Sequence, residues 1–215
     1  MPSPAESRPD APAPPKPPLP YVTIFIIVTS VLAYGIDSVI DKSPAVSLAM
    51  LSGGFVRSRQ WWRMISYAFV HAGPLHLGMN MFVAYQMGPP IERRLGSVRF
   101  AEASLVTCLG GAAAVLLLAP PNVATVGASG MILGWAGMIV PLLDRKNLAQ
   151  FSRFLLINAL ISFIPGVSWQ GHLGGFVAGL ACGVVLRLRP ALFSSVAPVL
   201  VAATAIAGLL GAYRR

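Results

Sequence analysis

The chain has 215 residues, of which 55% are apolar and only 11% are charged, and its mean hydropathy is +0.70. This composition excludes an ordinary soluble domain and is typical of an integral membrane protein. The net charge of +9 does not indicate nucleic-acid binding, because the basic residues lie in small groups between apolar runs. The two cysteines both lie within apolar runs and predict neither a disulfide framework nor a CxxC metal site.

The first twenty residues contain nine prolines and are predicted to form a flexible cytoplasmic tail, because such a composition cannot bury a core. They lack the basic, apolar and small-residue order of a secretory signal. The apolar run from Tyr21 to Ile36 is therefore expected to stay as the first membrane span. We divide the chain into a tail (1–20), a membrane domain (21–190) and an additional C-terminal helix (191–215).

Seven membrane-spanning helices are expected in all. A helix needs about 20 residues to cross the hydrocarbon core, so the uncharged run 103–143 must fold back once, and Pro120-Pro121-Asn122 is the expected turn. Pro165-Gly166 divides a later apolar run in the same way. A long connection joins the first two spans. The predicted spans are 21–40, 75–92, 101–119, 127–143, 148–165, 171–187 and 191–212.

The distribution of basic residues favours a cytoplasmic N-terminus. In that orientation the inner connections carry arginine or lysine, whereas the short outer connections 120–126 and 166–170 carry neither. Three arginines in the long first connection and two at the C-terminus oppose this bias. The second, fourth and sixth spans then begin on the outer side, so His76, Ser129 and His172 are expected at one depth.

Ser129 lies in the motif Gly127-Ala128-Ser129-Gly130, at the expected start of the fourth span. Taken alone, small residues in a membrane helix most often serve close packing. In the first turn of a helix, however, free backbone N–H groups and the positive end of the dipole could stabilise a developing oxyanion. A serine at this position is a candidate nucleophile if a base lies nearby.

His172 is the candidate base. Glycines at 171, 175, 179 and 183 recur every four residues and predict a small-residue face along the sixth span. This face serves packing, and its consequence is that the sixth span can approach a small-faced helix such as the fourth. His172 would then come within hydrogen-bonding distance of Ser129. An ionisable side chain at this depth without a role would be costly.

His76 and Asn80 are spaced i, i+4 and share a face of the second span. They either form hydrogen bonds between helices or donate to the charge that develops in acyl transfer. A zinc site made of His71, His76 and His172 is not favoured, since no HExxH motif occurs and no carboxylate lies near the outer ends. No metal and no cofactor is therefore expected.

The acidic residues indicate which kind of serine chemistry is favoured. Of the seven, two lie in the tail and three lie near the inner ends of spans. Only Asp37 and Asp41, which close the first span, remain candidates for a third hydrogen bond to His172. The sequence therefore favours a Ser–His dyad over a Ser–His–Asp triad.

Together these motifs resemble the rhomboid family of intramembrane serine proteases. The resemblance covers about residues 55–187 and rests on five segments in the order of the family. They are Trp62-Arg63, His71 with His76-Leu77-Gly78-Met79-Asn80, Glu92-Arg93-Arg94-Leu95-Gly96, Gly127-Ala128-Ser129-Gly130 and His172-Leu173-Gly174-Gly175. The resemblance implies an all-α integral membrane fold of bacterial type, with a six-helix core and one added C-terminal helix.

For the site, the resemblance implies Ser129 as nucleophile and His172 as general base. It also implies Asn80, His76 and the Ser129 amide as the groups that stabilise the oxyanion. Two departures stand out. Leu133 occupies the position of an aromatic residue that stacks on the catalytic histidine in bacterial members, and glycine replaces the usual alanine before His172. Neither change removes a group that does chemistry.

Outside the site, the resemblance implies that the connection 41–74 lies partly in the outer leaflet. Trp61, Trp62 and Arg63 suit a position at the membrane interface on physical grounds. Glu92 is expected to form a structural pair with one of the two arginines that follow it, near the inner surface.

We therefore expect an intramembrane serine endopeptidase in a bacterial inner membrane, with transmembrane proteins as substrates and the lipid bilayer as its surroundings. The sequence indicates neither the substrate nor the oligomeric state. One alternative is a catalytically silent relative that binds membrane proteins for quality control, which intact Ser129 and His172 disfavour. The other is a transporter or channel, but neither inverted repeats nor acidic residues within the spans are visible.

Overall fold

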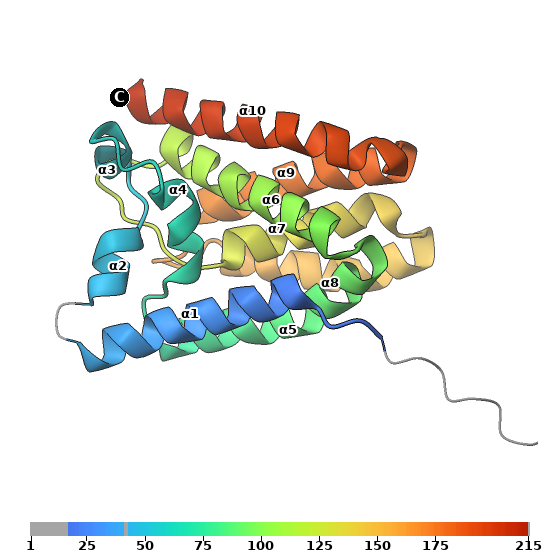
Figure 1. The fold of residues 1–215 in the computed structure, drawn as a ribbon, viewed down its shortest axis with the longest axis horizontal. Helices are drawn as coiled ribbons and strands as arrows, with labels where there is room; N and C mark the ends of the chain where they lie inside the picture. The colour runs from blue at the N-terminus through green and yellow to red at the C-terminus, as the bar shows by residue number, and fades with distance from the viewer. Residues whose placement is uncertain (1–16, 41–42, 215) are drawn as a thin grey trace, which may run out of the picture.

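The computed structural model describes residues 17–40 and 43–214, which form a bundle of helices (Figure 1). Most of the predicted tail, together with Asp41, lies outside the described residues. The long helices are α1 (Tyr21–Val39), α5 (Pro74–Leu95), α6 (Ser97–Leu118), α7 (Ser129–Ile139), α8 (Arg145–Ile161), α9 (Trp169–Leu188) and α10 (Phe193–Tyr213). The connection after α1 contains α2 (Pro44–Ala49), α3 (Gly53–Arg57), α4 (Arg63–Ser66) and the 3₁₀ turn η1 (Tyr67–Phe69).

The seven long helices agree with the seven predicted spans, and most ends differ by only a few residues. By length and apolar character, α1, α6, α9 and the segment Pro190–Tyr213 could each cross a membrane alone. The apolar helix that contains α7 is shorter, because it begins at Ser129 and ends in a 3₁₀ turn at Leu142. Ser129 is thus the first residue of its helix, two residues after the predicted start of the span and within the predicted first turn.

Helices α6, α7 and α9 form the centre of the bundle, where glycine allows their backbones to touch. A Cβ atom at Gly175 would overlap the carbonyl oxygen of Gly130, and one at Gly179 would overlap that of Gly134. Helix α6 contributes a row of small buried residues to the same centre. The predicted approach of the glycine face of α9 to a small-faced α7 is confirmed.

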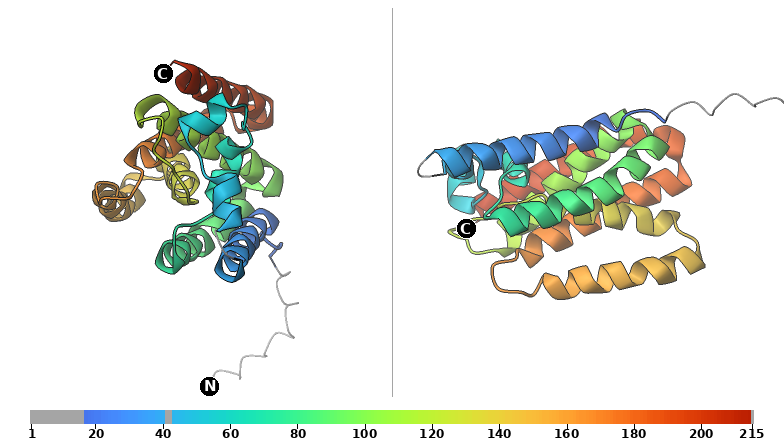
Figure 2. Two further views of the ribbon diagram at one scale, coloured as in Figure 1. Left: turned by 90° about the vertical axis from the view of Figure 1, so that its left-hand side faces the viewer. Right: turned by 90° about the horizontal axis from the view of Figure 1, so that it is seen from below.

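Helices α8 and α10 lie at the periphery of the bundle (Figure 2). No residue of α8 is buried, whereas α10 packs along α6 through Gly208 and Gly211. The C-terminal end of α10 is held by Arg57, whose Nη1 donates to the carbonyl oxygen of Ala212 at 3.2 Å. The added helix is therefore joined to the connection between α1 and α5, and α8 is the more loosely attached of the two.

The connection between α1 and α5 is built around a buried arginine. Arg63 is only 3% exposed, and its Nη1 donates to the carbonyl oxygens of Ser47 and Met50 at 2.9 and 3.0 Å. The Arg63 side chain therefore satisfies backbone carbonyls inside the connection, and its position relative to a membrane interface stays a prediction. Trp61 and Trp62 are more than half exposed and remain suited to an interface.

Glu92 has a different partner from the one the sequence indicated. Its carboxylate accepts hydrogen bonds from the amides of Val22 and Thr23, both at 2.9 Å, and from the Thr23 hydroxyl at 2.8 Å. It also accepts one from the Ser97 hydroxyl at 2.7 Å. The first amides of a helix lack partners within the helix and attract negative charge. Glu92 therefore fixes the start of α1 and is not the partner of a neighbouring arginine.

Candidate active site

Three helix starts meet at one end of the bundle, on the left in Figure 1. His76 lies in the first turn of α5, Ser129 opens α7 and His172 lies in the first turn of α9. All three line one cavity of about 650 Å³, together with the loops that precede these helices. The motifs that the sequence placed at one depth therefore share one cavity.

Ser129 and His172 are hydrogen-bonded to each other. The distance between the serine Oγ and the histidine Nε2 is 2.8 Å. The two residues are 43 positions apart, and they meet because α7 and α9 approach through their glycine faces. This distance lies in the range that allows a proton to pass from a hydroxyl to an imidazole nitrogen. The serine hydroxyl is thus placed to donate to a base at the cavity wall.

The turn before Ser129 is fixed by contacts that require a glycine. Gly127 has φ +112°, and a Cβ atom there would lie 2.6 Å from the ring of His76. Its amide donates to the carbonyl oxygen of Tyr67 at 2.9 Å. The next amide, of Ala128, donates to Nε2 of His71 at 3.4 Å. Burial lowers the pKa of His71 to about 4, so its ring is neutral near pH 7 and can accept this hydrogen bond.

The two predicted oxyanion groups occupy different positions. His76 lines the cavity beside Ser129, whereas Asn80 is 6% exposed and is not among the residues that line it. The Asn80 Nδ2 donates to the carbonyl oxygen of His76, one turn earlier on α5, at 2.9 Å. One amide proton of Asn80 is therefore engaged by its own helix.

The second ring nitrogen of His172 contacts a serine that the sequence analysis did not identify. Ser162 Oγ lies 2.6 Å from His172 Nδ1. No sequence signal marks this residue, since a lone serine at a helix end belongs to no motif. Asp37 is not a partner of His172, because its carboxylate accepts hydrogen bonds from the backbone amides of Ala45 and Val46 at the start of α2.

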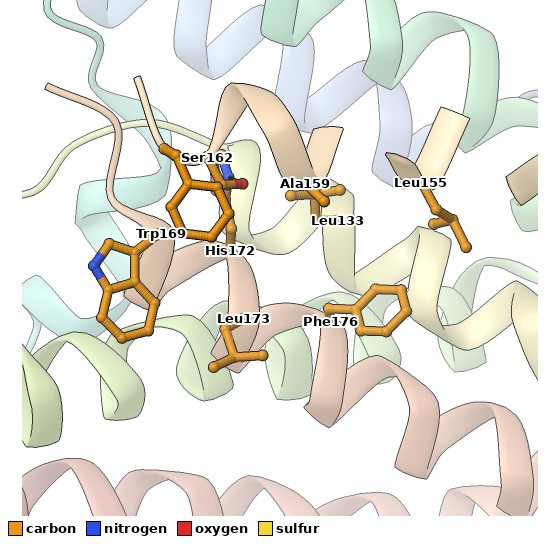
Figure 3. Close-up of a pocket in the computed structure, with 9 residues that line it drawn as sticks. Leu133, Leu155, Ala159, Ser162, Trp169, His172, Leu173 and Phe176 are labelled. Atoms are coloured by element: carbon orange, nitrogen blue, oxygen red, sulfur yellow. Dashed lines mark hydrogen bonds between the residues drawn. The ribbon is translucent and has the colours of Figure 1, made fainter. Parts of the chain in front are cut away.

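A second cavity lies on the other side of His172, between α7, α8 and α9 (Figure 3). Its volume is about 470 Å³, and its walls are almost entirely apolar. Leu133, at the position where the resemblance predicts an aromatic ring, lines this cavity together with His172. The orientation of His172 therefore depends on contacts other than ring stacking.

The fold and the cavity that Ser129 and His172 line define a helical membrane protein with a hydrogen-bonded serine and histidine at one end of its bundle. The chain matches the family model of the Rhomboid domain over residues 58–189, which is more than half of its length. The protein belongs to the rhomboid family.

Several relatives support this assignment. The chain is 32% identical to "RHOMBOID-like protein 6, mitochondrial" of Arabidopsis thaliana over 144 residues, which are 63% of this chain and 47% of that protein. It is 31% identical to "Rhomboid-type serine protease 2" of Emericella nidulans over 140 residues, 61% of this chain and 28% of the relative. It is 28% identical to "Rhomboid protease GluP" of Bacillus subtilis over 157 residues, 68% and 30% of the two chains. The chain spans about half or less of the length of these relatives.

Proposed function

We propose that this protein is a serine endopeptidase that cleaves the transmembrane segments of other membrane proteins. The observation that carries the proposal is the 2.8 Å hydrogen bond between Ser129 Oγ and His172 Nε2 at the wall of a cavity. Relatives that are named proteases, in Bacillus subtilis and Emericella nidulans, support the same activity. The supporting geometry lies within the part of the chain that matches the family.

In this mechanism Ser129 Oγ attacks the carbonyl carbon of the scissile peptide bond while its proton passes to His172 Nε2. The tetrahedral intermediate collapses when the imidazolium returns that proton to the leaving amine, which gives an acyl-enzyme on Ser129. Water then attacks the ester, with His172 again taking and returning one proton. The unpaired amides of the first turn of α7, that of Ser129 among them, would stabilise the oxyanion.

A transmembrane helix must unwind locally before its peptide bond can reach Ser129, because a helix satisfies its own backbone hydrogen bonds. Residues that destabilise a helix, above all glycine, would therefore favour cleavage near them. The cavity at the helix starts is lined by hydroxyl and imidazole groups as well as apolar side chains, which suits the admission of water for the second step.

The experiment that tests this function compares membrane proteins released from cells that carry the wild-type protein with those released from cells that carry Ser129→Ala. Proteomics should find membrane-protein fragments that depend on Ser129, and the purified protein in liposomes should cut one of those proteins at the same bond. If both strains release the same fragments, this protein does not cleave those membrane proteins and the proposal fails. Capture of intact membrane proteins by both forms would favour the silent relative.

We also propose that the protein lies in a bacterial inner membrane with its N-terminus in the cytoplasm, as the basic residues between spans suggest. In a background without Cys108 and Cys182, a cysteine at Asn122 should react with an impermeant thiol reagent added to intact cells. A cysteine at Gln150, exposed near the start of α8, should react only after the membrane is opened. The reverse pattern would invert the protein and contradict the proposed orientation.

Asn80→Ala should lower kcat by about 10- to 10³-fold with little change in the folded protein, the range typical for loss of one oxyanion donor. Only the second amide proton of Asn80 is free to donate, and Asn80 does not line the cavity, so the smaller end of the range is expected. His76→Ala should have a comparable or smaller effect. Steady-state kinetics on the two purified variants measures kcat for each. An unchanged kcat in Asn80→Ala would make Asn80 a packing residue.

A further inference from the structure

His172 has a second hydrogen-bond partner, which contacts the ring nitrogen that does not face Ser129. Ser162 is the residue that follows α8, and it is 8% exposed. Its Oγ lies 2.6 Å from His172 Nδ1 and 2.7 Å from the carbonyl oxygen of Asn158, one turn earlier. Figure 3 shows Ser162 and His172 side by side at one end of the apolar cavity.

A serine hydroxyl has one proton to donate and two lone pairs that accept. A carbonyl oxygen can only accept, so the Ser162 proton is directed to Asn158. The contact with His172 is then satisfied only if Nδ1 carries a proton and donates it to Ser162. In a neutral imidazole the other nitrogen, Nε2, is left as the acceptor, and this is the nitrogen that faces the Ser129 hydroxyl.

We propose that Ser162 is a positioning residue that holds His172 in the tautomer with the proton on Nδ1 and thereby keeps Nε2 free to act as the base. The chain of donors runs from Ser129 to His172 to Ser162 to the carbonyl of Asn158. When Ser129 gives its proton to Nε2, the imidazolium keeps its bond to Ser162, so no buried N–H loses its partner during the step. This inference rests on the proposed protease function only for its kinetic consequence.

Two features of the surroundings make the contact necessary. The cavity beside the ring is apolar and wide, so Leu133 offers neither a hydrogen bond nor a ring face to fix the imidazole. Helix α8 has no buried residue, and Ser162 gives its C-terminal end a direct polar link to α9. An imidazole N–H left unbonded in such a site would be costly, which favours the observed arrangement.

The test uses the full chain with ¹⁵N-labelled histidine, of which the sequence contains three. The ¹⁵N shifts and the couplings to ring protons identify which nitrogen of His172 is protonated, and His71→Gln and His76→Gln spectra assign the signals. The wild type should show His172 protonated on Nδ1 alone. Ser162→Ala should show both tautomers, and Ser162→Thr, which keeps the hydroxyl and has the cavity for its methyl group, should restore the first pattern.

In parallel, kcat of Ser162→Ala should fall about 10- to 100-fold with KM unchanged, because general-base catalysis weakens when the base is misoriented or in the wrong tautomer. Ser162→Thr should recover most of the loss. The matched control is Ser152→Ala, which removes an exposed hydroxyl bonded to its own helix and should change neither readout.

Unchanged tautomers in Ser162→Ala would overturn the proposal, whatever the kinetics. So would a loss of activity that Ser162→Thr does not recover while its melting temperature equals that of the wild type. If the wild type has no protease activity, the proposed function fails, but the NMR comparison still decides whether Ser162 holds the tautomer.

Discussion

Gly179→Ala is expected to abolish most of the activity and to lower the thermal stability of the purified protein. The added Cβ would overlap the carbonyl oxygen of Gly134 and lie 2.7 Å from its carbonyl carbon. These neighbours are backbone atoms of α7, so they can give way only if the two helices move apart. Overpacking of a tight core costs about 1–3 kcal/mol, and here the movement also separates the elements that hold Ser129 and His172.

Activity should therefore fall by more than the folded fraction does, since a shift of one ångström breaks a 2.8 Å hydrogen bond before it unfolds a helix. Thermal unfolding in detergent and kcat at a temperature where the variant stays folded separate the two effects. The matched control is Gly35→Ala on α1, where an added Cβ meets no atom within 4 Å. Equal behaviour of the two variants would show that the contact between α7 and α9 does not position the site.

The arrangement of the spans could be predicted because the length of each apolar run, the turns between runs and the spacing of glycines can all be read from the sequence. Apolar length places the seven helices, and Pro120-Pro121 marks the turn that divides the longest apolar run. Glycine every four residues predicts close packing of α9 against a small-faced helix. The prediction of α7 as that helix is confirmed, because α7 carries Gly130 and Gly134 at the matching spacing.

The failures concern polar groups whose partners come from distant parts of the chain. Glu92 lies next to two arginines in sequence, but the structure places it against the free amides at the start of α1. Arg63 lies beside two tryptophans that suit an interface, yet it turns inward to backbone carbonyls. Sequence spacing reports neighbours along one helix and does not report which helix end lies opposite.

Ser162 illustrates the same limit within the candidate site. Carboxylates are the usual groups that orient the histidine in serine hydrolases, and the sequence offers only Asp37 and Asp41 as carboxylate candidates. A hydroxyl can do the same work when its own proton is engaged elsewhere, as here by Asn158. No pattern in the sequence distinguishes this serine from the exposed Ser152 of helix α8.

The proposed mechanism requires Ser129 to be a nucleophile that His172 activates. An isolated serine hydroxyl reacts slowly with electrophiles and needs an adjacent base to become reactive. A fluorophosphonate should therefore label the purified wild-type protein covalently, with the adduct mapped by mass spectrometry to Ser129. Ser129→Ala should give no adduct, and Ser152→Ala, which lacks an exposed serine that does not line the cavity, should label like the wild type.

The decisive measurement is the rate of this labelling in His172→Ala, with melting temperatures recorded to show that the variant is folded. The glycine face of α9 is unchanged in this variant, so the bundle should stay intact. We predict a fall in rate of about 10²-fold or more, the usual contribution of a general base. A His172→Ala protein that labels Ser129 as fast as the wild type would contradict the proposed mechanism.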